Sequence, residues 1–85
     1  MIIEFSAFWC SSCLVMKKVW NSVKEVYPNI EWKSLDLDFD NVEEKYHDLE
    51  KLPILIFEKE GIEVSRLVGE KKREEVIEWI KENMS

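Results

Sequence analysis

Two cysteines separated by two residues lie where an apolar run gives way to a helix-like stretch, and this arrangement restricts the possible folds most. Cys10 and Cys13 follow a strand-like segment over residues 2–5 and open a stretch with helical periodicity near Ser11. Cysteines three positions apart at the head of a helix lie on nearly the same face, with Cβ atoms roughly 5–6 Å apart. A disulfide needs about 3.5–4.5 Å between its Cβ atoms, so a small adjustment closes or reopens it. The pair therefore predicts a strand–turn–helix unit with two adjacent thiols.

The position of the two thiols also favours reversible thiol–disulfide exchange. Unpaired N–H groups and the macrodipole at a helix N-terminus stabilise a thiolate, which is the species that attacks disulfides. Two other interpretations stay open, namely a structural disulfide and half of a metal site shared by two chains. A structural zinc site usually needs four ligands, whereas this chain offers Cys10, Cys13 and His47. We therefore expect redox chemistry with no metal and no organic cofactor.

The length and charge of the chain exclude several classes of protein. Its 85 residues predict one small domain, residues 1–85, with one core. The net charge of −6 argues against binding driven by phosphate contacts, so we expect no nucleic-acid partner. The apolar runs are too short to span a bilayer, and no basic region precedes an apolar stretch at the N-terminus. Secreted disulfide scaffolds use more than two cysteines. We expect a monomer in the cytoplasm without a membrane partner.

The hydrophobic pattern predicts seven elements in the order strand, helix, strand, helix, strand, strand, helix. The predicted strands are residues 2–5, 30–38, 53–57 and 62–68, and the predicted helices are residues 11–26, 41–49 and 71–83. A right-handed crossover makes the first two strands parallel, and a turn at Glu60-Gly61 adds an antiparallel edge. The sequence therefore predicts an α/β architecture, a four-stranded mixed sheet with helices on both faces.

Two of the predicted helices have recognisable inner faces. The inner face of the first helix consists of Leu14, Val15, Val19, Val23 and Val26, with Lys17, Lys18 and Lys24 on the opposite face. The inner face of the short second helix consists of Val42, Tyr46 and Leu49. Both sets recur at the three- and four-residue spacing of an amphipathic helix, so we expect them to face the sheet.

At this point the sequence resembles a thioredoxin. The resemblance rests on Trp9 before the Cys-x-x-Cys motif, on the Leu52-Pro53 step that opens an apolar strand, and on Gly61 and Gly69. It covers essentially all of the chain, which is shorter than a full-length thioredoxin and lacks that family's first strand and helix. The resemblance implies a thioredoxin-like fold of the order βαβαββα.

The resemblance also implies a role for individual residues. Cys10 matches the exposed attacking cysteine of thioredoxins, and Cys13 matches the buried resolving cysteine. Pro53 matches the family's cis-proline. With Trp9, Leu52 and Gly69 it is expected to line the substrate-binding surface. The implied function is reduction of protein disulfides, with disulfide-containing proteins as substrates and a thioredoxin-reductase-type or other electron donor as partner.

Glu4 stands six residues before Cys10, where thioredoxins place a buried acid. An inward carboxyl group here could hold or pass the proton that Cys13 loses before it resolves a mixed disulfide. The alternative is a solvated carboxylate on a short strand. The lysine that neighbours this acid in thioredoxins has no clear match, because Ser34 stands at its position and Lys33 lies one residue away.

The sequence departs from the thioredoxin pattern at the active site and after the last strand. Ser11-Ser12 replaces the usual Gly-Pro between the cysteines. Gly69 is followed by Glu70, so a diglycine of the glutathione-binding kind is missing, which weakens a glutaredoxin interpretation. Three alternatives remain at this stage: a glutaredoxin-like protein, a metal- or cluster-binding module, and a non-catalytic interaction domain.

Overall fold

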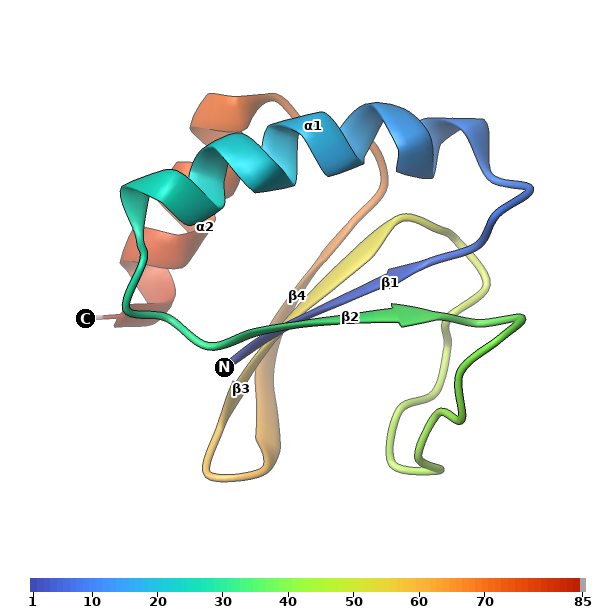
Figure 1. Ribbon diagram of the computed structural model, residues 1–85. Helices are drawn as coiled ribbons and strands as arrows, with labels where there is room; N and C mark the ends of the chain where they lie inside the picture. Colours follow the sequence, from blue (N-terminus) through green and yellow to red (C-terminus); the bar gives the residue numbers. More distant parts are fainter. Residues whose placement is uncertain (85) are drawn as a thin grey trace.

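A computed structural model describes residues 1–84. Its elements are β1 (Ile2–Ser6), α1 (Ser11–Val26), β2 (Trp32–Asp36), β3 (Ile54–Lys59), β4 (Ile62–Val68) and α2 (Arg73–Met84). The strands form one sheet in the order β2-β1-β3-β4 (Figure 1). β1 pairs in parallel with β2 and antiparallel with β3, and β3 and β4 form the expected hairpin. This mixed α/β sheet confirms the predicted fold class.

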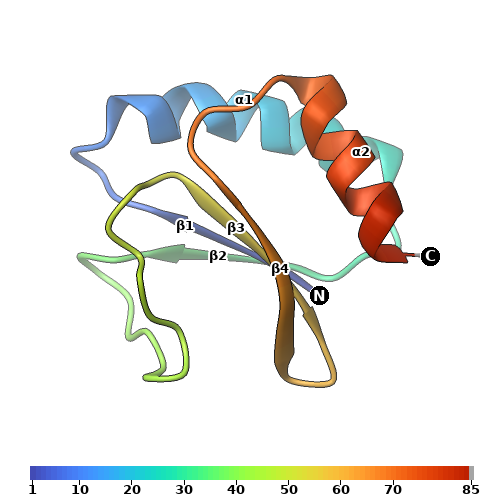
Figure 2. The ribbon, with the colours of Figure 1, turned by 180° about the vertical axis from the view of Figure 1, so that it is seen from behind.

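Both helices cover the same face of the sheet, as Figures 1 and 2 show. The expectation of helices on both faces was therefore wrong. The core on this face contains residues from both helices and from three positions of β1 and β3. These residues are Met16, Trp20, Val23, Val76, Trp79, Ile80, Ile2, Leu55 and Phe57. None of the helices among the described residues is long and apolar enough to cross a membrane.

The inner face of α1 differs from the one we expected. The buried residues are Cys13, Met16, Trp20 and Val23, whereas Leu14, Val15 and Val26 are exposed. Cys13 is fully buried at the start of the helix, and the residues three, seven and ten positions later follow it around the same face. The cysteine therefore sets the rotation of the helix, and it leaves two apolar side chains of the first turn in solvent.

The opposite face of the sheet is covered by residues 37–52, which contain no helix. The predicted helix over residues 41–49 was therefore wrong, although its predicted inner residues do reach the sheet. Val42, Tyr46 and Leu49 pack with Leu37 and Leu52 against the core of this face. The apolar spacing was thus a reliable guide to burial here and a poor guide to backbone conformation.

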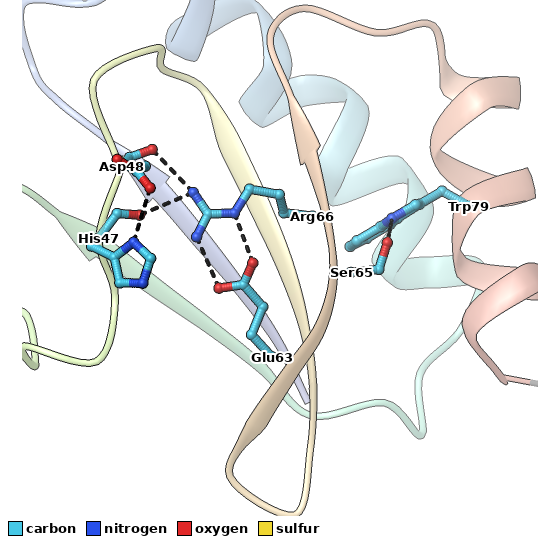
Figure 3. A network of polar contacts seen from close by, with 6 residues as sticks. All are labelled: His47, Asp48, Glu63, Ser65, Arg66 and Trp79. Carbon is cyan, nitrogen blue, oxygen red and sulfur yellow. Dashed lines mark hydrogen bonds and ion pairs between the residues drawn. The ribbon is translucent and has the colours of Figure 1, made fainter.

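Contacts with β4 explain why this segment is not helical (Figure 3). Arg66 donates to the carbonyl oxygens of His47 and Asp48, both at 3.0 Å, while its guanidinium also pairs with Glu63. Asp48 has φ = 57°, which a right-handed helix cannot contain. Tertiary hydrogen bonds therefore replace the helical ones in this segment.

Candidate active site

The two cysteines lie at the junction of β1 and α1. Cys10 is the N-cap of α1, and its N–H donates to the carbonyl oxygen of Ala7 at 3.0 Å. The N–H of Cys13 donates to Cys10 Sγ at 3.2 Å. Cys13 is 0% exposed, as the resemblance implied, whereas the expectation of an exposed Cys10 was wrong: Cys10 is 8% exposed, because it packs with Ala7, Cys13 and Leu52. The geometry thus gives Cys10 Sγ a backbone donor at a helix N-terminus, where negative charge is stabilised.

Cys13 is held as a thiol by its surroundings. Its pKa is raised to about 12, mainly by burial and then by the hydrogen bond and charge of Cys10, while a backbone hydrogen bond at Ala7 and the charge of Lys17 act in the opposite direction. The charge of Lys17, one turn along α1, therefore reaches the buried thiol. At neutral pH Cys13 keeps its proton as long as Cys10 is a neighbouring thiolate.

The Leu52-Pro53 peptide bond is cis, as the resemblance implied. Leu52 packs against the small cluster formed by Ala7, Cys10 and Cys13. The structure therefore brings this step to the thiols from a distant part of the sequence.

Gly69 joins the same surface from the end of β4. Its N–H donates to the carbonyl oxygen of Pro53 at 2.8 Å. Its φ of 89° is a conformation that favours glycine, although a Cβ atom here would meet nothing within 4 Å. Trp9 is 63% exposed immediately before Cys10. The predicted substrate-binding residues Leu52, Pro53 and Gly69 thus lie together, with Trp9 exposed beside Cys10.

Glu4 is buried beneath α1, with 3% of its surface exposed. Its Oε1 accepts hydrogen bonds from Lys24 Nζ at 3.0 Å, from Trp32 Nε1 at 2.7 Å and from Ser34 Oγ at 2.6 Å. Glu4 therefore points inward, as expected. Its role as the group that exchanges a proton with Cys13 stays a prediction, because the hydrogen bonds of this carboxylate lead to α1 and β2.

Lys24 is a site residue that the sequence analysis missed. Lys33 pairs in register with Ile3, one position from the Glu4–Ser34 pair, so it lies on the other face of the sheet. The lysine that contacts the buried acid comes instead from α1. The available signal was that Lys24 stands four residues after Trp20, which places it one turn along the same helix face.

The third candidate metal ligand of the sequence, His47, lies in the segment of residues 37–52. His47 is exposed and contacts Asp48. Within residues 1–84, no group of three or more His, Cys, Asp or Glu side chains is arranged to hold a metal ion.

The fold and the two thiols together define a thioredoxin-like protein. The family model "Thioredoxin" matches residues 1–82, and the chain belongs to the thioredoxin family. The thioredoxin H-type of Fagopyrum esculentum is 33% identical over 75 residues, which are 87% of this chain and 64% of that relative. The thioredoxin of Chlamydia trachomatis is 29% identical over 80 residues, which are 94% of this chain and 78% of that relative.

Solved structures show the same fold. The thioredoxin NaTrxh of Nicotiana alata superimposes with a TM-score of 0.82 at 28% identity, covering 95% of this chain and 70% of that one. The thioredoxin of Fasciola hepatica gives a TM-score of 0.83 at 23% identity, covering 95% and 77%. The chain spans less than two thirds of the length of several curated plant relatives, 64% and 59% in two of them.

Proposed function

We propose that this protein is a thiol–disulfide oxidoreductase that reduces protein disulfides through Cys10 and Cys13. The observation that carries the proposal is the pairing of the two thiols, in which Cys10 Sγ accepts the N–H of a fully buried Cys13 at the head of α1. Membership of the thioredoxin family supports the same function.

The reaction follows from the different surroundings of the two sulfurs. The Cys10 thiolate attacks one sulfur of a substrate disulfide, and the other substrate sulfur leaves as a thiolate that takes up a proton. Cys13 then loses its proton and attacks Cys10 Sγ, which releases the second substrate thiol. The substrate gains two electrons and two protons, while Cys10 and Cys13 are oxidised to a disulfide. No metal or organic cofactor takes part.

The raised pKa of Cys13 gives the two steps their order. Part of the rise comes from the hydrogen bond and the charge of Cys10. Once Cys10 is bound in a mixed disulfide it carries no charge, so these two contributions fall away. The pKa of Cys13 then decreases, and the resolving thiolate forms after the substrate is attached.

A substrate segment would lie along Leu52 and Gly69. Leu52 contacts the thiol cluster, and an extended peptide could pair with its backbone as an added strand. Trp9 would cover the other side of the segment. We further propose a monomer in the cytoplasm, whose disulfide is reduced again by a thioredoxin-reductase-type or other electron donor.

Single cysteine variants test the proposal by insulin reduction with dithiothreitol as the electron donor. Cys10→Ser should abolish the activity, because the thiol that remains, Cys13, is fully buried. Cys13→Ser should instead accumulate a mixed disulfide with insulin, visible by mass spectrometry. At neutral pH, iodoacetamide should alkylate Cys10 of the reduced protein before Cys13. Equal alkylation of both residues, or undiminished activity of Cys10→Ser, would contradict the assigned roles.

A further inference from the structure

We propose that Phe8 and Phe39 extend the substrate-docking surface beside Cys10 and favour disulfides flanked by an apolar and a basic side chain. This inference rests on the function proposed above and names its substrate class. We call Phe8, Trp9 and Phe39 the aromatic patch. The patch is 66% exposed at Phe8, 63% at Trp9 and 75% at Phe39.

The patch is assembled from two segments that are far apart in the sequence. Phe8 lies between β1 and α1, and Phe39 lies in the turn after β2, yet their ring centroids are 5.5 Å apart. The N–H of Leu37 donates to the carbonyl oxygen of Ser6 at 2.9 Å and ties the two segments together. Because β1 and β2 are parallel, their carboxyl ends meet at one edge of the sheet (Figure 1). Cys10 follows β1 at this edge.

The exposure of these rings is best explained by a partner that covers them. Aromatic side chains are enriched in the buried centres of protein interfaces, where they supply a large share of the binding energy. Phe8 stands two residues before the attacking sulfur, so a substrate that reaches Cys10 passes the patch. A substrate side chain that covers both rings must be apolar, since it would otherwise lose its hydrogen bonds to water.

The charge around Phe39 adds a second requirement. Asp36, Asp38 and Asp40 alternate with the residues of this turn. The turn is closed by hydrogen bonds from the N–H of Asp36 to Asp40 Oδ2 and from the N–H of Asp38 to Asp36 Oδ1, both at 2.8 Å. Three carboxylates beside an exposed aromatic ring attract lysine or arginine and repel acidic segments. The occupant that fits is therefore a protein segment with an apolar and a basic residue near its half-cystine.

Two disulfide-linked peptides of equal length provide the test. One peptide has Phe and Lys beside the half-cystine, and the other has Ser and Glu. Hydroxyethyl disulfide serves as a small substrate, dithiothreitol reduces the enzyme again, and uncatalysed rates are subtracted. The variants are Phe8→Ser/Phe39→Ser and Asp38→Asn. Ile62→Ser is the matched control, because Ile62 is 67% exposed in the β3–β4 hairpin, at the opposite end of β1 from Cys10.

For each variant, kcat/KM on a peptide is divided by the rate on hydroxyethyl disulfide. For the Phe/Lys peptide, this ratio should fall about tenfold in Phe8→Ser/Phe39→Ser, which corresponds to about 1.4 kcal/mol. For the Ser/Glu peptide it should change less than about twofold. Asp38→Asn should weaken the salt dependence measured with the Phe/Lys peptide. Ile62→Ser should match the wild type in every assay.

Two kinds of result would overturn the inference. The first is an equal loss on both peptides, or no loss on either. The second is a wild-type dimer in equilibrium sedimentation that Phe8→Ser/Phe39→Ser converts to a monomer with unchanged peptide ratios, because the patch would then join two copies of the chain. A wild-type protein that cannot reduce insulin or either peptide would instead refute the proposed function itself.

Discussion

Glu4 and Glu58 are both buried, one on each face of the sheet, and the groups that hold them differ. Glu4 is 3% exposed beneath α1, and its Oε1 accepts hydrogen bonds from Lys24, Trp32 and Ser34. Glu58 is 5% exposed on the face covered by residues 37–52.

The carboxylate of Glu58 has fewer partners. It accepts one short hydrogen bond, from the hydroxyl of Tyr46, and Lys45 Nζ lies 3.4 Å away. Both of these partners belong to the segment without a helix. Glu4, on the helix-covered face, is therefore hydrogen-bonded by two different elements, α1 and β2. Glu58, on the other face, contacts side chains of one segment only among these partners, and its contacts hold that segment against the sheet.

The largest effect on stability should come from Tyr46→Phe. This change leaves the buried carboxylate of Glu58 with Lys45 alone, and a buried charged group that loses a hydrogen bond costs about 1–3 kcal/mol. The ring keeps its edge-to-face contact with Phe5, whose centroid is 5.3 Å away, so the loss reports the hydroxyl. Urea unfolding followed by tryptophan fluorescence measures it. A cost below that of Ser34→Ala would contradict the comparison.

Ser34→Ala should cost less, about 0.5–1.5 kcal/mol, the usual contribution of one hydrogen bond. Glu4 would keep Lys24 and Trp32 as donors, so its carboxylate would not be left unpaired. The same urea experiment gives the number. If Ser34→Ala lowered the free energy of unfolding as much as Tyr46→Phe, Lys24 and Trp32 would not compensate for the lost hydrogen bond to Glu4.

Alkaline pH should remove the contribution of the Tyr46–Glu58 hydrogen bond to the free energy of unfolding. Burial raises the pKa of Tyr46, and the hydrogen bond and charge of Glu58 add to the shift. The unfolded chain loses this proton near pH 10, whereas the folded protein keeps it to higher pH. The contribution of Tyr46 is therefore present below about pH 10 and is lost as the pH rises toward the folded value. Unfolding free energies above pH 9 should fall more steeply in the wild type than in Tyr46→Phe.

The elements that sequence reasoning predicted are those whose structure is decided locally. Residues 11–26 form α1 with the bounds that we expected, because the signals that begin and end this helix, Cys10 and Pro28, are adjacent to it in the sequence. Residues 41–49 were predicted wrongly because Arg66 and Glu58, from other strands, bind that segment. The hydrophobic pattern of a segment does not reveal which residues of distant strands will bind it.

The candidate site divides in the same way. The resemblance to thioredoxins implied the cis Leu52-Pro53 bond and the burial of Cys13 correctly, since each belongs to a short motif, whereas the expected exposure of Cys10 was wrong. Lys24 and the contact between Phe8 and Phe39 were missed. Each arises from the rotation of α1 or from the parallel pairing of β1 and β2, which only the assembled fold fixes.

The smallest expected effect concerns the rate at which Cys13 resolves a mixed disulfide when Glu4 is changed. A general base for Cys13 at Glu4 would typically contribute about 10²–10⁴-fold to the resolving step. The hydrogen bonds of Glu4 instead lead to Lys24, Trp32 and Ser34, and the cation that lowers the pKa of Cys13 is Lys17. We therefore expect Glu4→Gln to change the rate of this step less than about twofold, far below that range.

Glu58→Gln is the matched control, because it removes the other buried charge on the face away from α1. Stopped-flow release of thionitrobenzoate from its mixed disulfide with Cys10, measured against pH, follows the attack by Cys13 directly. From the hydrogen bonds of Glu4 we expect Glu4→Gln and Glu58→Gln to give superimposable pH profiles. A profile altered in Glu4→Gln alone, at equal folded fraction, would establish Glu4 as the proton acceptor and reverse this assignment.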